Sequence, residues 1–343
     1  MESALVGLLA RHMPGVDRIA SLRRLSGGAS QETWSFDALA GGREIPLILR
    51  RRPGGMTPGD ESMALGLETE AALLGLAAGA GVPVPEVRCV LEPGDGLGSG
   101  YVMTRLEGET IPRRILRDAA YDAVRPRLAR QCGAILARIH GIGGGASGVP
   151  DPTPPERPIA SGSVLEEVPL APARVQLQQY RNLYDGYDQP HPVFDLAFRW
   201  LADRADEAPR VSLVHGDFRN GNLMIGSDGV CGVLDWELAH RGDPMEDLGW
   251  ICVNSWRFGE IDRPVGGFGD RDELFAGYEE AGGGTVDPER VRCWETLGTL
   301  KWGIMCLMMY AIFHSGADRS VERAAIGRRA SETEIDLLGL IGG

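Results

Sequence analysis

The stretch VSLVHGDFRNGNLMIGSDGVCGVLDWELAHRGDPMED, residues 211–247, carries the signals that decide the fold. Its Ser-Asp-Gly turn signal at 227–229 lies between two short apolar runs, a pattern that predicts a β-hairpin. Because paired strands lie about 4.8 Å apart, the hairpin should return Asp235 to the neighbourhood of Asn222. An amide oxygen and a carboxylate in that arrangement can share a small hard cation such as Mg²⁺.

Asp217 lies five residues before Asn222, in the loop that precedes the hairpin. We expect this carboxylate to stay off the cation and to face a second substrate. An aspartate and an asparagine from one loop, together with a later metal-binding aspartate, are the parts that phosphoryl transfer requires. The alternative is a structural turn in which the Asp and Asn side chains only cap the loop.

The spaced set of HGD, an asparagine five positions later and LDWE after a hairpin resembles the aminoglycoside phosphotransferase and choline kinase group, relatives of the protein kinases. In that group HGD replaces the kinase HRD, and D-W/F-E replaces DFG. The resemblance implies an α+β, bilobal, protein-kinase-like fold. It places a small N-terminal lobe, an antiparallel sheet plus a helix, at residues 1–107, and a larger, mainly helical C-terminal lobe at 108–343.

The composition is that of an ordinary globular protein, with 43% apolar and 24% charged residues. A chain of 343 residues is long enough for two compact units. The formal net charge of −13 argues against nucleic acid or an anionic membrane as a partner. The same charge permits a cationic substrate without requiring one.

Three local features of the sequence indicate the cellular location that we expect. The first fifteen residues lack a basic start, a long apolar run and a cleavage site, so we expect no signal peptide. The six cysteines form no C-x-x-C pair, which predicts free thiols in a reducing cytoplasm. The most apolar stretch, 297–313, contains Lys301 and is at the short limit for a membrane span, so we expect a buried helix.

A helix at 5–13 and strands at 32–36 and 45–50 are predicted for the N-terminal part. The segment before the first of these strands holds the predicted phosphate flap, in which glycines let backbone N–H groups approach an anion and serines add hydroxyl donors. These candidate nucleotide-binding residues are Ser26, Gly27, Gly28 and Ser30. A simple glycine turn is the alternative.

The resemblance makes Arg50 a candidate for holding the nucleotide phosphates. In these kinases a lysine on the third strand does so and pairs with a glutamate of the next helix, but this chain has a single lysine, Lys301. Arginine keeps the charge and can bind phosphate oxygens through two N–H groups, although it is bulkier. The pattern LRRxP resembles a subgroup that includes kinase-like domains fused to acyl-CoA dehydrogenases. The sequence does not choose firmly among Arg50, Arg51 and Arg52.

Glu70, on a helix predicted at 61–79, is the candidate partner of Arg50, with Glu68 as its competitor. Residues 101–109 resemble the segment of the family that meets the adenine. There Arg105 and Leu106 should supply backbone groups, and Met103 should line the pocket.

The C-terminal part should be helical at 121–140, 175–187, 193–205, 271–282 and 288–316, with an irregular excursion at 143–172. Asp243 and Asp247 match the family pattern G-D-P-x-x-D-L, and we assign them to support of the catalytic loop. His140 should be a capping or packing histidine and not a catalyst. The Met- and Trp-rich stripe of the last helix should be core, with an apolar wall of the acceptor pocket as the alternative.

These features predict an ATP- or GTP-dependent O-phosphotransferase that acts on a hydroxyl group of a small molecule. Asp217 would be the catalytic base, and Asn222 and Asp235 would hold Mg²⁺ on the nucleotide. For the acceptor, the arginine-type subgroup favours a partly apolar hydroxyl compound such as a hydroxyacyl derivative. The alternatives are an aminoglycoside-specific kinase, a catalytically silent nucleotide-binding module, and a metal-dependent hydrolase that uses His215. The sequence leaves the preference for ATP or GTP and the oligomeric state open.

Overall fold

The computed structural model describes residues 1–25, 31–53, 64–143, 161–187 and 189–342, so the predicted flap residues Ser26, Gly27, Gly28 and Ser30 lie outside the described residues. The chain forms two compact units, which are not continuous in sequence. The first comprises Met1–Glu109, the described part of Gly145–Val168, and Leu223–Ala239. The second comprises the described residues of Thr110–Gly144, Pro169–Asn222 and His240–Gly343.

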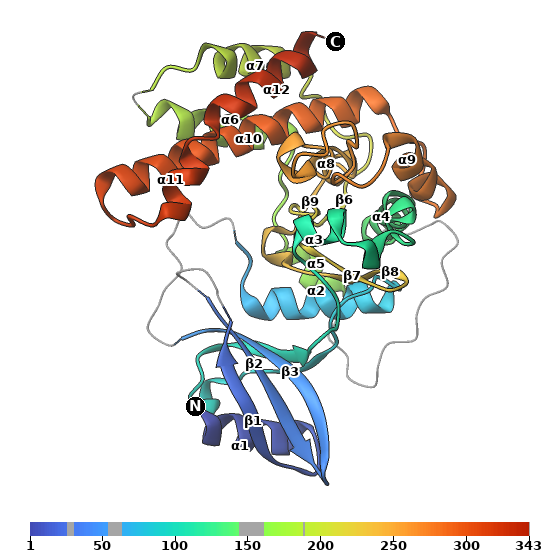
Figure 1. Cartoon of the computed structure of the whole chain (residues 1–343), viewed down its shortest axis with the longest axis vertical. Coiled ribbons are helices and arrows are strands. Elements are labelled where there is room, and N and C mark those ends of the chain that lie inside the picture. Colours follow the sequence, from blue (N-terminus) through green and yellow to red (C-terminus); the bar gives the residue numbers. More distant parts are fainter. Residues whose placement is uncertain (26–30, 54–63, 144–160, 188, 343) are drawn as a thin grey trace. The chain divides into compact units, whose positions relative to one another are not determined.

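An antiparallel sheet of five strands in the order β1-β2-β3-β5-β4 forms the body of the first unit (Figure 1). Its strands are β1 (Val16–Arg24), β2 (Glu32–Ala40), β3 (Arg43–Arg52), β4 (Val87–Val90) and β5 (Ser99–Thr104). Helix α1 (Glu2–His12) buries its leucines against Phe36, Leu49 and other apolar side chains of the sheet. Gly41 and Gly42 both have positive φ, which a two-residue turn between β2 and β3 requires.

Helix α2 (Leu67–Gly79) packs on β5. The prediction of a helix from residue 61 was wrong for the described residues 64–66. Gly66 is extended, and the N–H of Leu65 donates to the carbonyl of Glu237 at 2.7 Å. This bond ties the segment to a neighbouring part of the chain, and the helix therefore begins only at Leu67.

The predicted hairpin is confirmed as β7 (Leu223–Gly226) and β8 (Gly229–Val233), with Leu223 opposite Val233. The hairpin belongs to the first unit. The backbone N–H groups of Ile225 and Glu109 each donate to the other's carbonyl, and the N–H of Val233 donates to the carbonyl of Pro83. A short 3₁₀ turn, Trp236–Leu238, follows the hairpin. These bonds attach the residues after the hairpin to the sheet-bearing unit.

Helices form most of the second unit, together with the short antiparallel pair β6 (Ser212–Val214) and β9 (His240–Gly242). The helices are α3 (Pro112–Arg117), α4 (Leu128–His140), α6 (Ala173–Asp185), α7 (Pro192–Ala202), α8 (Met245–Trp250), α9 (Arg271–Glu280), α10 (Pro288–Ser315), α11 (Val321–Gly327) and α12 (Ala330–Gly342). The long helix α10, orange in Figure 1, packs against α7, α8, α11 and α12. Helices α4 and α9 cross at glycines: a Cβ on Gly133 would lie 2.0 Å from the Leu274 carbonyl oxygen.

Two predicted boundaries were wrong in this part of the chain. The helix expected at 121–140 begins at Leu128, because Pro126 lacks a backbone donor and the preceding residues form 3₁₀ turns. The stretch 143–172, expected to be irregular, contains helix α5 (Ser161–Glu167), which belongs to the first unit.

By length and composition alone, α10 could cross a membrane, with a mean hydropathy of 1.4 in its most apolar window. Half of that window is buried within the protein. This is weak evidence for a membrane span, since the core helix of a globular unit shows the same features.

Candidate active site

The loop after β6 is held by a buried carboxylate. The backbone N–H groups of His215 and Gly216 donate to the two oxygens of Asp247 at 2.8 and 3.0 Å. Nε2 of the buried His140 lies 3.0 Å from the same side chain. Burial alone would raise the pKa of Asp247, but the hydrogen bond and charge of His140 outweigh burial and lower it. The predicted support role of Asp247 is confirmed, and His140, expected to cap or pack, is buried between Asp247 and Tyr278.

Three side chains orient the candidate base, Asp217. The amide nitrogen of Asn222 donates to Oδ2 at 2.6 Å, and the indole N–H of Trp250 donates to Oδ1 at 2.8 Å. Arg219 Nε lies 2.9 Å from the same Oδ1. Both carboxylate oxygens are thus held in one orientation. The loop that carries Asp217 is itself held by the hydrogen bonds of His215 and Gly216 to Asp247. A positioned carboxylate of this kind can accept a proton from a hydroxyl group.

Asn222 contributes its amide nitrogen to Asp217, which leaves the amide oxygen as its atom for a cation. The other predicted metal ligand, Asp235, lies in the first unit, whereas Asn222 is the last residue of its segment in the second. Asp235 adopts a left-handed conformation with φ of 66°, which aspartate tolerates better than most residues. Such backbone strain is often found at functional positions.

Within the first unit, Arg50 lies at the centre of a cluster of carboxylates. Its Nη2 is 2.8 Å from Oδ1 of Asp235 and 3.1 Å from Oε2 of Glu237, and its Nε is 3.3 Å from Oε2 of Glu70. Nε also donates to the side-chain oxygen of Gln31 at 3.0 Å. The predicted pairing of Arg50 with Glu70 is therefore confirmed.

The alternatives to this pair are occupied elsewhere. Side chains alternate along a strand, so Arg51 points away from Arg50 and bonds Glu32 at 2.8 Å. Glu68 is exposed on α2, whereas Glu70 is almost fully buried. The structure thus distinguishes residues that the sequence could not separate.

Burial and charge act in opposite directions on this cluster. Burial alone would lower the pKa of the Arg50 guanidinium, but the charges of Glu70 and Asp235 outweigh it, so the pKa is raised. Burial raises the pKa of Glu70 to about 7, and the positive charge of Arg50 opposes this rise only in part. The negative charges of Asp235 and Glu237, which share Arg50, raise the pKa of Glu70 further. Glu70 therefore takes up a proton at a higher pH than an unperturbed glutamate does.

This raised pKa predicts a pH-dependent stability. Glu70 is protonated in the folded chain but ionised in the unfolded chain between about pH 4.5 and 7, so its contribution to stability is lost as pH rises through this window. The total loss is on the order of 3 kcal/mol. As the pH is raised from 5 to 8, the melting temperature of the wild type should fall relative to that of Glu70→Gln. Glu68→Gln, the exposed control, should follow the wild type. Parallel pH profiles for the wild type and Glu70→Gln would contradict the assignment.

The segment predicted to meet the adenine is partly engaged in the sheet. The N–H of Arg105 donates to the carbonyl of Pro46 at 3.0 Å, and its guanidinium bonds Asp37 and Ser35. The sheet therefore uses the N–H of Arg105, and the expectation that Arg105 supplies a backbone group to the adenine stays a prediction. Met103 pairs with Ile48 across β3, and its role and that of Leu106 stay predictions.

The single lysine of the chain is largely enclosed in the second unit. Lys301 Nζ, on α10, donates to Gln176 at 2.9 Å, lies 3.3 Å from Glu246 and faces the ring of Trp250 at 5.4 Å. Burial alone would lower the pKa of Lys301, but the charge of Glu246 outweighs it and the pKa is raised. Lys301 thus supports the tryptophan that bonds Asp217.

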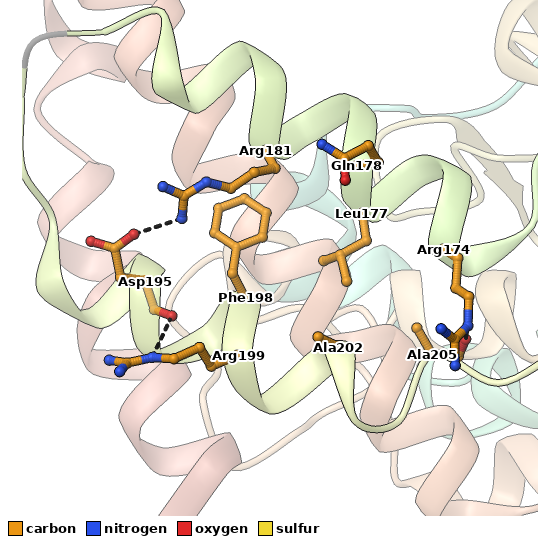
Figure 2. Close-up of a pocket in the computed structure, with 9 residues that line it drawn as sticks. All are labelled: Arg174, Leu177, Gln178, Arg181, Asp195, Phe198, Arg199, Ala202 and Ala205. Carbon is orange, nitrogen blue, oxygen red and sulfur yellow. Dashed lines mark hydrogen bonds and ion pairs between the residues drawn. The ribbon is translucent and has the colours of Figure 1, made fainter.

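A groove of about 670 Å³ lies between α6 and α7 (Figure 2). It has an apolar floor that includes Leu177 and Phe198, and an arginine rim. Arg181 on that rim is paired with Asp195 and Asp185, each at 2.7 Å. The groove uses the face of α6 opposite Gln176, which contacts Lys301, so it is separate from the surroundings of Asp217.

Sequence reasoning missed Arg219, Trp250 and Trp256. Arg219 bonds Asp217 and lies over the ring of Trp256 at 4.6 Å. An arginine two positions after the HGD aspartate was a visible signal for the first. No local signal pointed to the two tryptophans, because they reach the loop from residues more than thirty positions away.

Comparisons with known proteins agree with this geometry. Residues 21–283 match the model of a family described as "Phosphotransferase enzyme family". Acyl-CoA dehydrogenase family member 10 of Mus musculus is 28% identical over 261 residues, which cover 74% of this chain and 22% of the mouse protein. Family member 11 of Gallus gallus is 28% identical over 264 residues, covering 73% and 30% respectively. The chain therefore spans less than a third of the length of these curated relatives.

Solved structures show the same fold. A candidate aminoglycoside phosphotransferase of Ralstonia eutropha matches 99% of this chain and 98% of its own, with a TM-score of 0.72 and 19% identity. Aminoglycoside phosphotransferase APH(4)-Ia, solved with AMP-PNP and hygromycin B, matches with a TM-score of 0.59 and 16% identity, over 99% of this chain and 98% of its own. Spectinomycin phosphotransferase APH(9)-Ia, solved with ADP and spectinomycin, matches with a TM-score of 0.60 and 14% identity, over 97% of this chain and 94% of its own. These matches confirm the predicted α+β, kinase-like fold.

Proposed function

Since the chain belongs to the phosphotransferase enzyme family, we propose that it transfers the γ-phosphoryl group of ATP or GTP to a hydroxyl group of a small molecule. The observation that carries this proposal is the carboxylate of Asp217, which Asn222, Trp250 and Arg219 hold from three sides. A fixed carboxylate removes the entropy cost of aligning a base with the acceptor hydroxyl. It accepts the hydroxyl proton as the bond to phosphorus forms.

The nucleotide is held by charge. Arg50 is half-buried and paired with Glu70, so its guanidinium is fixed in direction. Guanidinium groups bind phosphate oxygens through parallel N–H groups. Asn222 and Asp235 are the residues that would hold Mg²⁺, since an amide oxygen and a carboxylate are oxygen ligands of the type this ion prefers. The ion would neutralise charge on the phosphates. Asp235 also forms an ion pair with Arg50.

The acceptor is proposed to be a hydroxy acid or its thioester. The arginine-type pattern at Arg50 and the similarity to proteins named acyl-CoA dehydrogenase family members both support this class. Antibiotics such as the hygromycin B and spectinomycin bound by two structural neighbours are the alternative. We also propose a cytoplasmic location, in line with six free cysteines among the described residues.

Turnover assays test this proposal. The protein is incubated with Mg·ATP or Mg·GTP and with panels of hydroxy acids, their thioesters and aminoglycosides, while release of the nucleoside diphosphate is followed. We expect release that depends on a hydroxy acid or thioester. Turnover with aminoglycosides alone would overturn the acceptor class but not the phosphotransferase proposal. Absence of turnover on every panel would overturn both.

A catalytically silent nucleotide-binding module is the second candidate, and the Arg50–Asp235 contact favours it, because this bond occupies a predicted metal ligand. Stabilisation by Mg·ATP without turnover would support that candidate. The metal-dependent hydrolase has less support. His215 is fully buried, and its Nδ1 accepts the backbone N–H of Asp217 at 3.2 Å.

A further inference from the structure

Three tryptophans lie together next to Asp217 in the second unit. They are Trp250 at the end of α8, Trp256 in the following 3₁₀ turn and Trp302 on α10. The ring centroids of Trp250 and Trp256 are 5.2 Å apart, and those of Trp256 and Trp302 are 4.9 Å apart. Because the indole N–H of Trp250 bonds Asp217, the tryptophan cluster formed by these three residues begins at the carboxylate.

Two members of the tryptophan cluster have an unused polar group. The indole nitrogens of Trp256 and Trp302 are buried and have no hydrogen-bond partner among the residues that the structure describes. Most indole N–H groups in this protein are paired: those of Trp34, Trp236, Trp250 and Trp294 donate to Glu32, Val233, Asp217 and Asp243. The two unpaired donors thus belong to neighbouring rings, and the ring of Trp256 contacts both Trp250 and Arg219, which bond Asp217.

A buried donor without a partner costs free energy, and a phenylalanine would fill the same space without that cost. Unpaired donors are therefore expected where a ligand supplies the missing acceptor. The tryptophan cluster fits this case, because the acceptor molecule must come within reach of Asp217.

The charges around the cluster indicate what kind of ligand it takes. The guanidinium of Arg219 lies 4.6 Å from the centroid of Trp256, that of Arg329 lies 5.9 Å from Trp302, and Lys301 lies 5.4 Å from Trp250. Each of these cations also pairs with a carboxylate, that of Asp217, Glu332 and Glu246 respectively, so the cluster gains no net positive charge from them. A polyamine is disfavoured because protein cations already lie over the rings that its ammonium groups would contact. Carbonyl and carboxylate oxygens accept hydrogen bonds from indole N–H groups and are attracted by arginine.

We propose that Trp256 and Trp302 recognise the acceptor, and that the acceptor is an alcohol that carries a second oxygen acceptor, a carbonyl or a carboxylate. This inference rests on the proposed function, in which Asp217 takes the proton of the alcohol. The two indole N–H groups bind the second oxygen, and the aromatic rings contact the carbon chain between the two oxygens. Trp250 keeps Asp217 directed at the hydroxyl group.

Trp256→Phe and Trp302→Phe test the proposal, because phenylalanine keeps an aromatic ring and removes only the donor. Trp200→Phe is the matched control, since Trp200 lies on α7 under Arg204 and outside the tryptophan cluster. With 3-hydroxybutyrate and its N-acetylcysteamine thioester as probes, each cluster variant should raise the acceptor KM about 10-fold. The ATP KM should be unchanged. An acceptor KM that stays at the wild-type value in the double variant would overturn the proposal.

A binding measurement separates recognition from catalysis. In ¹⁵N-indole-labelled Asp217→Asn protein, the N–H signals of Trp256 and Trp302, assigned from the two phenylalanine variants, should shift when either probe is added. The Trp200 signal should not move, and a polyamine should cause no shift. Shifts without turnover in the wild type would leave the recognition surface standing and remove the proposed catalysis. Turnover without shifts would leave the proposed catalysis standing and overturn the recognition by Trp256 and Trp302.

Discussion

Asp217→Asn is expected to lower kcat by roughly 10²- to 10⁴-fold, the usual contribution of a positioned general base. The substitution removes the oxygen that accepts the proton. It also places an amide NH₂ where Trp250, Asn222 and Arg219 all donate, so at least one of these hydrogen bonds is lost. Diphosphate release at saturating acceptor measures kcat, and titration calorimetry with Mg·ATP should give an unchanged Kd.

Asp262→Asn is the control for this experiment, because it makes the same chemical change at an exposed aspartate of the same unit. It should retain wild-type kcat. If Asp217→Asn keeps more than about a tenth of the wild-type kcat, Asp217 is not the base, since such a residual rate falls outside the range for a lost general base.

Arg50→Met is expected to raise the ATP KM by about 10- to 100-fold, because hydrogen bonds to charged groups contribute about 1.5–3 kcal/mol. It should also destabilise the protein by about 3–5 kcal/mol, since Glu70 is left as a buried acid without its partner. Steady-state kinetics and urea denaturation measure the two effects separately. Arg51→Met, which removes the neighbouring guanidinium that pairs with Glu32, should leave the ATP KM unchanged.

Arg50→Lys distinguishes charge from shape. Lysine keeps the positive charge, but its three N–H groups leave a single nitrogen. It therefore cannot reproduce the spacing of Nε, which bonds Gln31, and Nη2, which bonds Asp235 and Glu237. We expect an ATP KM between those of the wild type and Arg50→Met. Equal values for the lysine and methionine variants would show that the phosphates are not bound through the charge at this position.

Local chemistry explains what the sequence predicted well. The hairpin at 223–233 follows from its turn residues and flanking apolar runs, which act over a few positions. The presence of Asp217 and Asn222 in one loop also follows from local spacing, although the hydrogen bond between them was not predicted. Asp247 was predictable as a support because its motif occurs in the same decisive stretch.

The remaining features depend on contacts between distant residues. The choice of Arg50 over Arg51 depends on which face of β3 turns towards α2, and register pairs with β2 and β5 fix that face. The late start of α2 depends on a hydrogen bond between Leu65 and Glu237. Trp256 reaches Arg219 across 37 positions of sequence, and no periodicity in either segment indicates that contact.

The burial of Lys301 has a practical consequence for chemical labelling. As the only lysine of the chain, it provides the only side-chain amine, and that amine is bonded to Gln176 and Glu246 with 12% of the side chain accessible. Amine-directed reagents should therefore couple at the α-amino group of the polypeptide and leave the folded surface unmodified. A dye or a solid support attached in this way gives a preparation in which every molecule is joined at the same atom.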